Sequence, residues 1–409
     1  ILMIAWASKD FETSIAAGRN PALMSQDKVW SEVILEWNPV LDSIVWQWDA
    51  WDHLVQDFDR SKANFGNPKN FPELIDLNYD EHDGHPDWLH INSIDYNPVL
   101  DQIVLSVPYF NEFWVIDHST TTAEAASSAG GNSGKGGDLL YRWGNPMTYD
   151  AGTEEQQQLF FQHDVQWMNP KAGAGEEDYG KIILYNNRLP DLTSSVNFIA
   201  TLTNEAYQME EGVYLPNVFK QTVKHPAEEK RAYSTGLSSA QYLPNGNILV
   251  LAGRHGFAYE ISPANGIVWN YIVPLKAGRA VNQGDTLSIS NNTTFRMTRY
   301  GLDDPAFEGR NLTPQGYLEL SPNEGFCGLV NIHETIDVSS IKLFPNPAQH
   351  SINIQMERQQ LIYIYDVLGR RVQTLETQHQ QQNIDVSTWQ KGVYYLQTEY
   401  GAVQQFVVD

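Results

Sequence analysis

Short apolar runs, separated by turn residues, recur along almost the whole chain. The runs are rich in Val, Ile, Tyr and Trp, and the turns draw on 29 Gly and 20 Pro residues. Few windows place apolar residues at the 3.6-residue spacing of an amphipathic helix, whereas short β-branched and aromatic runs are typical of strands. The pattern therefore predicts an all-β protein.

One unit of strands and turns repeats in the first part of the chain. It consists of a polar turn, an apolar strand, a second strand that ends in a turn, and a strand that ends in Trp or Tyr. The clearest copies occupy residues 34–48, 101–143 and 245–271, and another begins at Gly180. Strand repeats with periodic turn and aromatic motifs are typical of β-propellers, and a single β-sandwich is the alternative. The irregular spacing predicts long insertions on one face, where a site is expected.

The pattern changes near residue 336, where Gln becomes common and charges nearly balance. Short strands with period-2 alternation are predicted at residues 351–355, 362–366 and 392–397. Such strands are typical of a small β-sandwich. We therefore predict two domains, a propeller at 1–335 and a sandwich at 336–409.

Composition and charge narrow the choice of partners. The chain has 409 residues, with 50 Asp and Glu against 26 Lys and Arg, and residues 1–340 carry −23 of the net charge of −24. Nucleic acids and anionic membranes are bound through Lys and Arg, so neither is an expected partner. No apolar stretch approaches the ~18 residues of a membrane-spanning helix. An anionic substrate would therefore need a locally basic pocket inside an acidic shell.

The cysteine content and the first residues of the sequence support two further predictions. The single cysteine, Cys327, excludes a disulfide within the chain, and we assign it no catalytic role. The sequence begins at Ile1 inside a strand-like run, so we expect the first domain to be truncated at its N-terminus.

Residues 80–90 contain three His and four carboxylates within eleven residues. Such a cluster could bind Zn or Mn. However, Gly84 and Pro86 make His82 and His85 turn residues, and no ligand spacing matches a known motif. We therefore predict no metal site and no cofactor, and keep a metal-dependent hydrolase as an alternative.

Four other positions suit an oxyanion. His90 and His163 stand where strands are expected to begin, and Arg188 follows a strand. His255 lies in a Gly-Arg-His-Gly turn between two strands. A single histidine is more often structural, but several at equivalent places in successive repeats would converge on the channel of a propeller. There a guanidinium binds two oxygens, an imidazolium donates a further hydrogen bond, and a neutral imidazole can act as a nucleophile.

Four blocks occur in order near the C-terminus: Leu-Phe-Pro-Asn-Pro-Ala (343–348), Ile-Tyr-Asp-Val-Leu-Gly-Arg (364–370), Ile-Asp-Val-Ser (384–387) and Gly-Val-Tyr-Tyr-Leu (392–396). With these blocks the segment resembles the type A C-terminal sorting domain of the Bacteroidetes type IX secretion system. The resemblance implies the secretion machinery as a partner, passage through the periplasm and outer membrane, and a secreted or cell-surface location. An ordinary β-sandwich binding module is the alternative.

Longer blocks mark the first domain: Trp-Asp-His-Leu-Val-Gln-Asp (51–57), Trp-Leu-His-Ile-Asn-Ser-Ile-Asp-Tyr-Asn-Pro (88–98), Gly-Lys-Gly-Gly-Asp-Leu-Leu-Tyr-Arg-Trp-Gly-Asn-Pro (134–146) and Thr-Phe-Arg-Met-Thr-Arg-Tyr (294–300). They resemble the bacterial arylsulfotransferase family. The resemblance implies a six-bladed propeller that moves a sulfuryl group from an aryl sulfate ester to a phenolic acceptor. The group travels through a sulfohistidine in a ping-pong reaction, without a nucleotide donor or metal.

The family's site uses, in chain order, His, His, Arg and a final nucleophilic His, which the resemblance carries over to His90, His163, Arg188 and His255. His255 would be the nucleophile, with His163 as the second choice. The other residues would hold the sulfuryl oxygens and the leaving phenolate.

Three more residues are expected near the substrate, namely Asn92, Asn187 and His53. The family also has an Asn two residues after its second His, where this chain has Val165. That departure bears on the range of substrates. An aryl group also needs an aromatic lining, and eleven of the twelve Trp precede residue 336.

A non-catalytic propeller that binds sulfated ligands is the main alternative to an enzyme. It would bind without turnover and would form no sulfohistidine.

Overall fold

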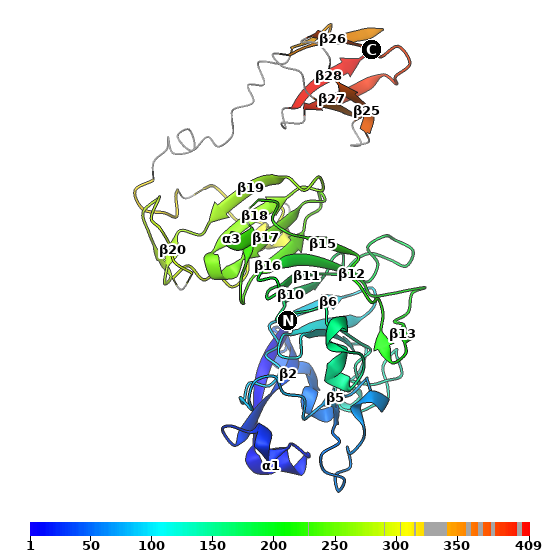
Figure 1. The fold of residues 1–409 in the computed structure, drawn as a ribbon, viewed down its shortest axis with the longest axis vertical. Coiled ribbons are helices and arrows are strands. Elements are labelled where there is room, and N and C mark those ends of the chain that lie inside the picture. Colours follow the sequence, from blue (N-terminus) through cyan, green and yellow to red (C-terminus); the bar gives the residue numbers. More distant parts are fainter. Residues whose placement is uncertain are drawn as a thin grey trace. The chain divides into compact units, whose positions relative to one another are not determined.

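The computed structural model describes residues 1–322 except 228, 290, 303 and 315, and residues 342–409 except 357–360, 367–370, 378–380 and 399–402. The chain divides into two compact units, 1–321 and 322–409 (Figure 1). Cys327 and the predicted boundary at 335–336 lie outside the described residues.

Strands dominate both units, which confirms the all-β prediction. The α-helices of the described residues are short: α1 (Phe11–Ala16), α2 (Thr122–Ala125) and α3 (Glu229–Ala232). Short 3-10 turns are η1 (Pro21–Leu23), η2 (Ala50–Asp52), η3 (Pro68–Asn70), η4 (Pro146–Tyr149), η5 (Glu154–Gln156), η6 (Gly253–His255) and η7 (Pro305–Phe307). No described helix has the length and apolar character needed to cross a membrane.

The first unit is built from antiparallel sheets whose strands are hydrogen-bonded in chain order. The first sheet is β1 (Leu2–Asp10), β2 (Lys28–Asn38) and β3 (Ser43–Asp49). The second is β6 (Ser93–Asn97), β7 (Gln102–Val107), β8 (Glu112–Asp117) and β9 (Tyr141–Trp143). The third is β10 (His163–Trp167), β11 (Lys181–Asn186), β12 (Ser195–Ala200) and β15 (Gln221–Val223). The fourth is β16 (Ser239–Tyr242), β17 (Ile248–Ala252), β18 (Phe257–Ile261) and β19 (Ile267–Ile272).

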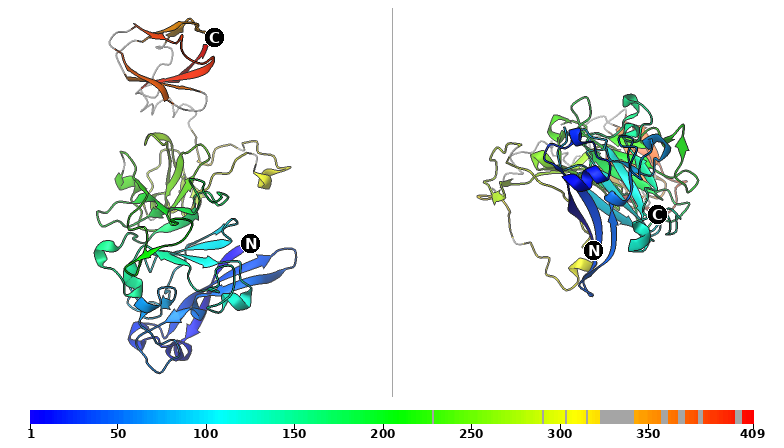
Figure 2. Two further views of the ribbon diagram at one scale, coloured as in Figure 1. Left: turned by 90° about the vertical axis from the view of Figure 1, so that its right-hand side faces the viewer. Right: turned by 90° about the horizontal axis from the view of Figure 1, so that it is seen from below.

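Small two-stranded sheets complete this unit. They are β4 (Leu54–Val55) with β5 (Ile75–Asp76), β13 (Met209–Glu210) with β14 (Val213–Tyr214), and β20 (Leu275–Lys276) with β21 (Arg279–Ala280). Figures 1 and 2 show the larger sheets following one another in chain order, from blue through cyan to green. No sheet formed by the described strands closes on itself.

Consecutive sheets pack face to face and share a core. β11 shows why: Ile182 and Leu184 face the core shared with the second sheet, whereas Ile183 and Tyr185 face the core shared with the fourth. A strand covered on both faces reads as an uninterrupted apolar run, because successive side chains point to opposite faces. This arrangement explains the apolar runs of the repeating unit.

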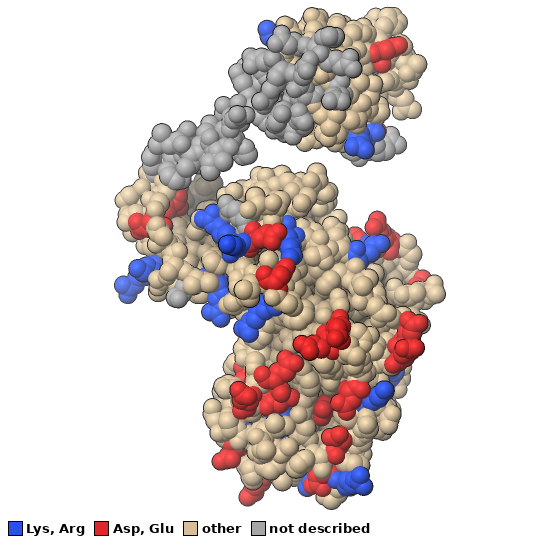
Figure 3. All heavy atoms as spheres, in the orientation of Figure 1, with Lys and Arg blue, Asp and Glu red and all other residues tan. Residues whose placement is uncertain are grey.

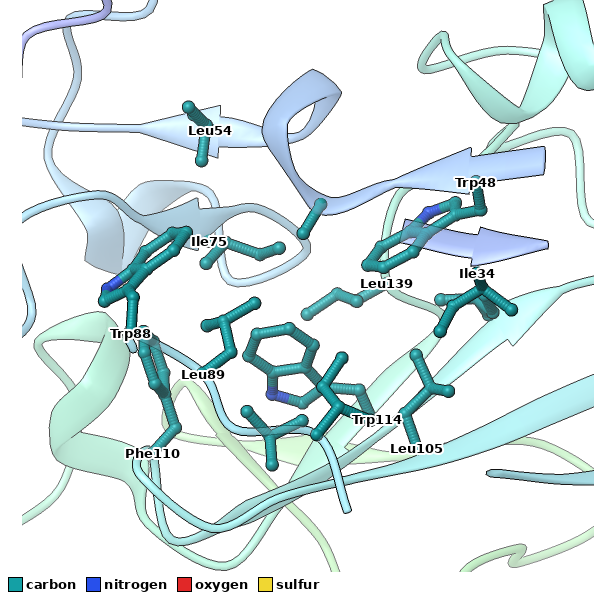
Figure 4. Close-up of a cluster of buried hydrophobic side chains, with 14 of the residues drawn as sticks. Ile34, Trp48, Leu54, Ile75, Trp88, Leu89, Leu105, Phe110, Trp114 and Leu139 are labelled. Carbon is teal, nitrogen blue, oxygen red and sulfur yellow. The ribbon is translucent and has the colours of Figure 1, made fainter. Parts of the chain in front are cut away.

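The core between the first and second sheets shows the same packing (Figure 4). Trp48 from β3 and Trp114 from β8 are fully buried there. Figure 4 shows Leu89 and Leu139 beside the Trp114 ring. Each fully buried aliphatic side chain contributes about 1.5–3 kcal/mol, so these cores fix how the sheets stack and hold the strand ends that carry the site.

The second unit consists of two antiparallel sheets. One is β22 (Lys342–Phe344), β23 (Ser351–Gln355) and β26 (Gln381–Asp385), and the other is β25 (Arg371–Glu376), β24 (Leu361–Asp366), β27 (Gly392–Thr398) and β28 (Val403–Val408). Side chains from both sheets form one core, which includes Ile352, Ile364, Leu396 and Phe406. Two sheets that share a core in this way form a β-sandwich.

Candidate active site

One end of the sheets in the first unit gathers the predicted residues. In an antiparallel meander, the start of the first strand and the turn between the second and third strands lie at the same end. In the second sheet these places hold His90, just before β6, and Tyr109, between β7 and β8. In the third sheet they hold His163, which starts β10, and Arg188, between β11 and β12.

The fourth sheet repeats the arrangement. Leu237 precedes β16, and η6 forms the turn between β17 and β18. This turn contains Arg254 and His255, so both belong to the same end of the fourth sheet. Leu237 links this sheet to the third, because its backbone N–H donates a hydrogen bond to Nε2 of His163 at 3.0 Å.

Left-handed backbone conformations cluster at these strand entrances. The φ angles are +57° at His90, Phe161 and Asp164, +60° at Leu237 and +94° at Ser238. Such angles disfavour any residue with a Cβ and cost on the order of 1–3 kcal/mol each. Strain of this kind is typical of functional sites, where it re-aims side chains.

His163 is a buried, neutral imidazole. Its Nδ1–H donates to Oδ1 of Asn187 at 2.9 Å and to the Phe161 carbonyl at 3.1 Å, while Nε2 accepts from Leu237. Burial is the main cause that lowers the pKa of His163 to about 4, and the positive fields of His90 and Arg188 lower it further. Its Nε2 lone pair is therefore already used within the protein.

Asn187 and Asn92 differ in which of their amide atoms have hydrogen-bond partners. Asn187 donates from Nδ2 to the carbonyls of Ser234 and Leu237 at 2.9 and 3.0 Å, so its whole amide is bonded and it positions His163. Asn92 donates from Nδ2 to the Gln162 carbonyl at 2.9 Å, but its Oδ1 is buried without a partner.

His90 is held by a carboxylate and by two aromatic rings. Its Nδ1 lies 2.5 Å from Oδ2 of Asp87. The imidazole stacks on Tyr109 at a centroid distance of 4.8 Å and lies 6.5 Å from Phe161. Since Asp87 occupies Nδ1, Nε2 is the ring atom that His90 can offer to a ligand.

A second carboxyl group lies behind this pair. Glu32 on β2 is fully buried, and its Oε1 accepts from Trp6 at 3.1 Å and from the Ile91 N–H at 3.3 Å. Burial, followed by the charge of Asp87, raises the pKa of Glu32 from 4.5 to about 8. Oε2 of Glu32 and Oδ1 of Asp87 are both buried without partners. Glu32 is therefore protonated at neutral pH.

Arg188 covers one side of Phe161. Its Cζ lies 3.5 Å from the ring centroid, and its Nε donates to the Thr235 carbonyl at 2.7 Å. Burial lowers the pKa of Arg188, and the nearby charge of Arg254 acts in the same direction. A cavity of about 280 Å³ opens here and is lined by Glu81, His82, Pro108, Tyr109, Asn111, Gln157, Phe160, Phe161 and Arg188.

His255 is partly buried in η6, and its carbonyl accepts from Nδ2 of Asn292 at 2.8 Å. Burial is the main cause that lowers its pKa, opposed by a hydrogen bond from the ring to the Tyr233 backbone. In the described part of the chain, no hydrogen bond joins His255 to His90, His163 or Arg188. The structure thus brings those three residues together around Phe161 and places His255 on the neighbouring sheet.

Comparison with known families shows the family of the first unit. The model of the arylsulfotransferase family, described as Arylsulfotransferase (ASST), matches residues 14–294. The chain belongs to the arylsulfotransferase family. A secretion system C-terminal sorting domain matches residues 342–408, so the protein is exported by the type IX system to the cell surface or beyond. No curated protein matches the chain.

Solved structures similar to the chain have low identity. One is the β-propeller domain of Cps50 (Swd1) from Myceliophteria thermophila, with 9% identity, a TM-score of 0.28, and coverage of 93% of this chain and 92% of that one. Another is virginiamycin B lyase from Staphylococcus aureus, with 10% identity, a TM-score of 0.25, and coverage of 77% and 69%.

Within the arylsulfotransferase domain, His53 has a structural role. Its Nδ1 lies 2.8 Å from Asp138 and its Nε2 lies 2.8 Å from the Ala125 carbonyl. The ring is buried and stacks on Trp48 at 5.6 Å. Both nitrogens are used, so His53 has no group to offer to a substrate.

The acidic 80–90 segment is bonded within itself and to its neighbours. Asp80 accepts from the backbone N–H groups of His82 and Gly84 at 3.1 and 2.6 Å, and Glu81 accepts from Asn111 at 2.8 Å. Across the residues that the structure describes, no three His, Cys, Asp or Glu side chains are placed to hold a metal ion. His82 instead packs edge-on against Tyr109, at a centroid distance of 3.6 Å.

Sequence reasoning missed Tyr109, Phe161 and Arg254. Trp was expected to supply any aromatic lining, yet no Trp lines the cavity around Arg188. The signal that could have found them is position, because Tyr109 and Arg254 occupy the same turn as Arg188 in the sheets before and after it. Figure 3 shows Lys and Arg near α3 with acidic side chains among them, and further acidic side chains over the rest of the first unit in view.

Proposed function

We propose that the first unit is an aryl sulfotransferase that moves a sulfuryl group from an aryl sulfate ester to a phenol. The observation that carries the proposal is the grouping of Arg188, His90 and neutral His163 around Phe161, beside a cavity with aromatic walls. A guanidinium and imidazoles suit the sulfuryl oxygens, and the aromatic rings suit the aryl group.

In the first half-reaction, an imidazole nitrogen attacks sulfur. The N–S bond forms, the S–O bond to the aryl group breaks, and the phenolate leaves with the electron pair and takes up a proton. In the second half-reaction, the acceptor phenol oxygen attacks the same sulfur, the N–S bond breaks, and the phenol loses its proton. The imidazole returns to its starting state, so no metal or nucleotide is consumed.

We assign the attack to His255, as the resemblance implies. His163 is less suited, because its Nε2 lone pair accepts from Leu237. We give His90 the role of proton donor to the leaving phenolate, since Asp87 holds its Nδ1 and Nε2 remains for the substrate.

We also propose that the four larger sheets are blades of a propeller with six blades. Face-to-face sheets with a shared core between each consecutive pair support this reading. Loops at one end of such blades would meet at the central channel, where donor and acceptor would bind. The sorting domain would engage the type IX machinery.

Purified protein given 4-nitrophenyl sulfate tests the activity. The expected result is release of 4-nitrophenol. The release should become faster when phenol is added, because phenol accepts the sulfuryl group and so speeds the second half-reaction. Binding of 4-nitrophenyl sulfate without any release would instead support a non-catalytic propeller. Loss of release with a chelator would support the metal hydrolase.

A further inference from the structure

A second guanidinium lies beside the sulfuryl site and has no assigned role. Nη2 and Nε of Arg254 lie 3.4 and 3.7 Å from the point where a Cβ on Gly236 would sit, and Cε1 of Phe161 lies 3.7 Å from the same point. Arg188 covers the Phe161 ring at 3.5 Å. The two guanidinium groups therefore both lie close to Phe161, which agrees with the effect of Arg254 on the pKa of Arg188.

Neither of these arginines is neutralised by a carboxylate in the part of the chain that the structure describes. Arg188 donates to a backbone carbonyl, and Nε of Arg254 is buried without any acceptor. Elsewhere in the unit, Arg142 and Arg299 each lie 2.6 Å from a glutamate oxygen. Other described arginines of the first unit without a carboxylate partner, such as Arg60, Arg279 and Arg310, are exposed, whereas Nε of Arg254 is buried.

Two like charges held together and partly desolvated are unfavourable unless an anion joins them. An aryl sulfate ester carries one negative charge, which Arg188 is placed to meet. Arg254 then needs a second anionic group from the substrate. A carboxylate fits, because the guanidinium binds its two oxygens through parallel hydrogen bonds.

We propose that Arg254 binds a carboxylate on the aromatic ring of the substrate, so that the preferred substrates are sulfated aromatic acids. The inference rests on the proposed sulfuryl transfer and deepens it. The Phe161 ring, close to both cations, offers the face on which the aryl ring packs.

The test compares two donors, 4-nitrophenyl sulfate and 2-carboxy-4-nitrophenyl sulfate, in the full chain. The measured quantity is the ratio of their kcat/KM values in wild type, R254M, R254Q and R254K. Comparing the ratio between proteins cancels the different leaving abilities of the two phenols. R60M serves as the matched control, because Arg60 is exposed on the segment between β4 and β5 and its loss changes the net charge equally.

R254M and R254Q should each lower the ratio by about 10- to 100-fold, the effect of one charge-assisted hydrogen-bonded pair. The loss should fall mainly on KM for the carboxylated donor. R254K should retain part of the ratio, and R60M should keep the wild-type ratio. Thermal unfolding of each variant checks that the fold is intact.

Two results would overturn the inference while leaving sulfuryl transfer in place. One is an unchanged ratio in R254M and R254Q. The other is an equal loss for both donors, which would assign Arg254 to the transferred sulfuryl group. A wild-type protein that releases nitrophenol from neither donor would instead reject the proposed function itself.

Discussion

Arg142 and Arg188 both lie over an aromatic ring in the first unit, yet Arg142 is paired with a carboxylate and Arg188 is not. Arg142 lies 4.7 Å from the Tyr149 centroid, is fully buried, and donates to Glu112 at 2.6 Å. Arg188 lies 3.5 Å from the Phe161 centroid and donates to the Thr235 carbonyl, and no carboxylate among the described residues pairs with it. The first guanidinium is paired with a carboxylate of the protein, whereas we propose that the second binds the substrate.

The same contrast separates two histidines. His53 uses both ring nitrogens within a core, while His90 uses one and keeps the other. Residue type alone therefore does not mark the site. The distinguishing property is an unmet charge or hydrogen bond at the end of the sheets where His90, Phe161 and Leu237 have left-handed backbones.

Arg142→Met should have the largest effect on stability. It leaves Glu112 buried without its counter-charge, which costs on the order of 3–5 kcal/mol. Urea unfolding followed by tryptophan fluorescence measures this loss. The double variant with Glu112→Gln should recover part of it, because no buried charge is then left alone. Equal stability of R142M and wild type would contradict the structural role.

Unlike Arg142→Met, Arg188→Met should have little effect on stability and a large effect on activity. Its free energy of unfolding should change by less than about 1 kcal/mol, because the protein supplies no counter-charge to lose. Its kcat/KM for 4-nitrophenyl sulfate should fall by about 10²–10³, the effect of removing one donor to the transition state. Steady-state kinetics and urea unfolding of the same preparation measure both quantities. A stability loss as large as that of R142M would contradict the proposed difference between the two arginines.

Asp87→Asn should lower kcat by about 10- to 100-fold, because His90 loses the carboxylate that holds its Nδ1–H. The loss should be larger for donors with poor leaving groups, which need a proton most. Measuring kcat for aryl sulfates over a range of phenol pKa values tests this. A uniform loss across all donors would point to a packing defect instead.

Glu32→Gln should have the smallest effect at neutral pH, because the amide resembles the protonated acid. Its pH dependence is diagnostic. A carboxyl group whose pKa is raised from 4.5 to about 8 on folding contributes stability that is complete below pH 4.5 and is lost as the pH rises toward 8. Wild type should therefore lose stability across this range more steeply than E32Q. Parallel curves from urea titrations at pH 5–8 would contradict the buried acid.

Much of the fold was predictable from the apolar runs. The predicted strands at 245–271 correspond to β17, β18 and β19, and His163 begins β10 as expected. The run predicted to start after His90 begins at Ser93, and His90 itself has a left-handed backbone. Local sequence fixes where strands lie, since their periodicity is local.

The hydrogen-bond partners of the site residues were not predictable in this way. The Nε2 lone pair of His163 is occupied by Leu237, which is 74 residues away along the chain. Glu32 lies 59 residues from the backbone group at Ile91 that it binds. Such partners are set by how the sheets stack, and no local pattern encodes them. Tyr109 and Phe161 were missed for a similar reason, because an aromatic residue in a turn looks like one more core residue.

Trapping and mapping the covalent intermediate tests the central claim most directly. The protein is mixed with ³⁵S-labelled 4-nitrophenyl sulfate without acceptor, digested at high pH, and its labelled peptides are sequenced. Our account predicts an acid-labile label on the peptide that contains His255, absent in H255N, present in H163N, and discharged by phenol. A wild-type protein that releases nitrophenol but carries no labelled histidine would contradict it.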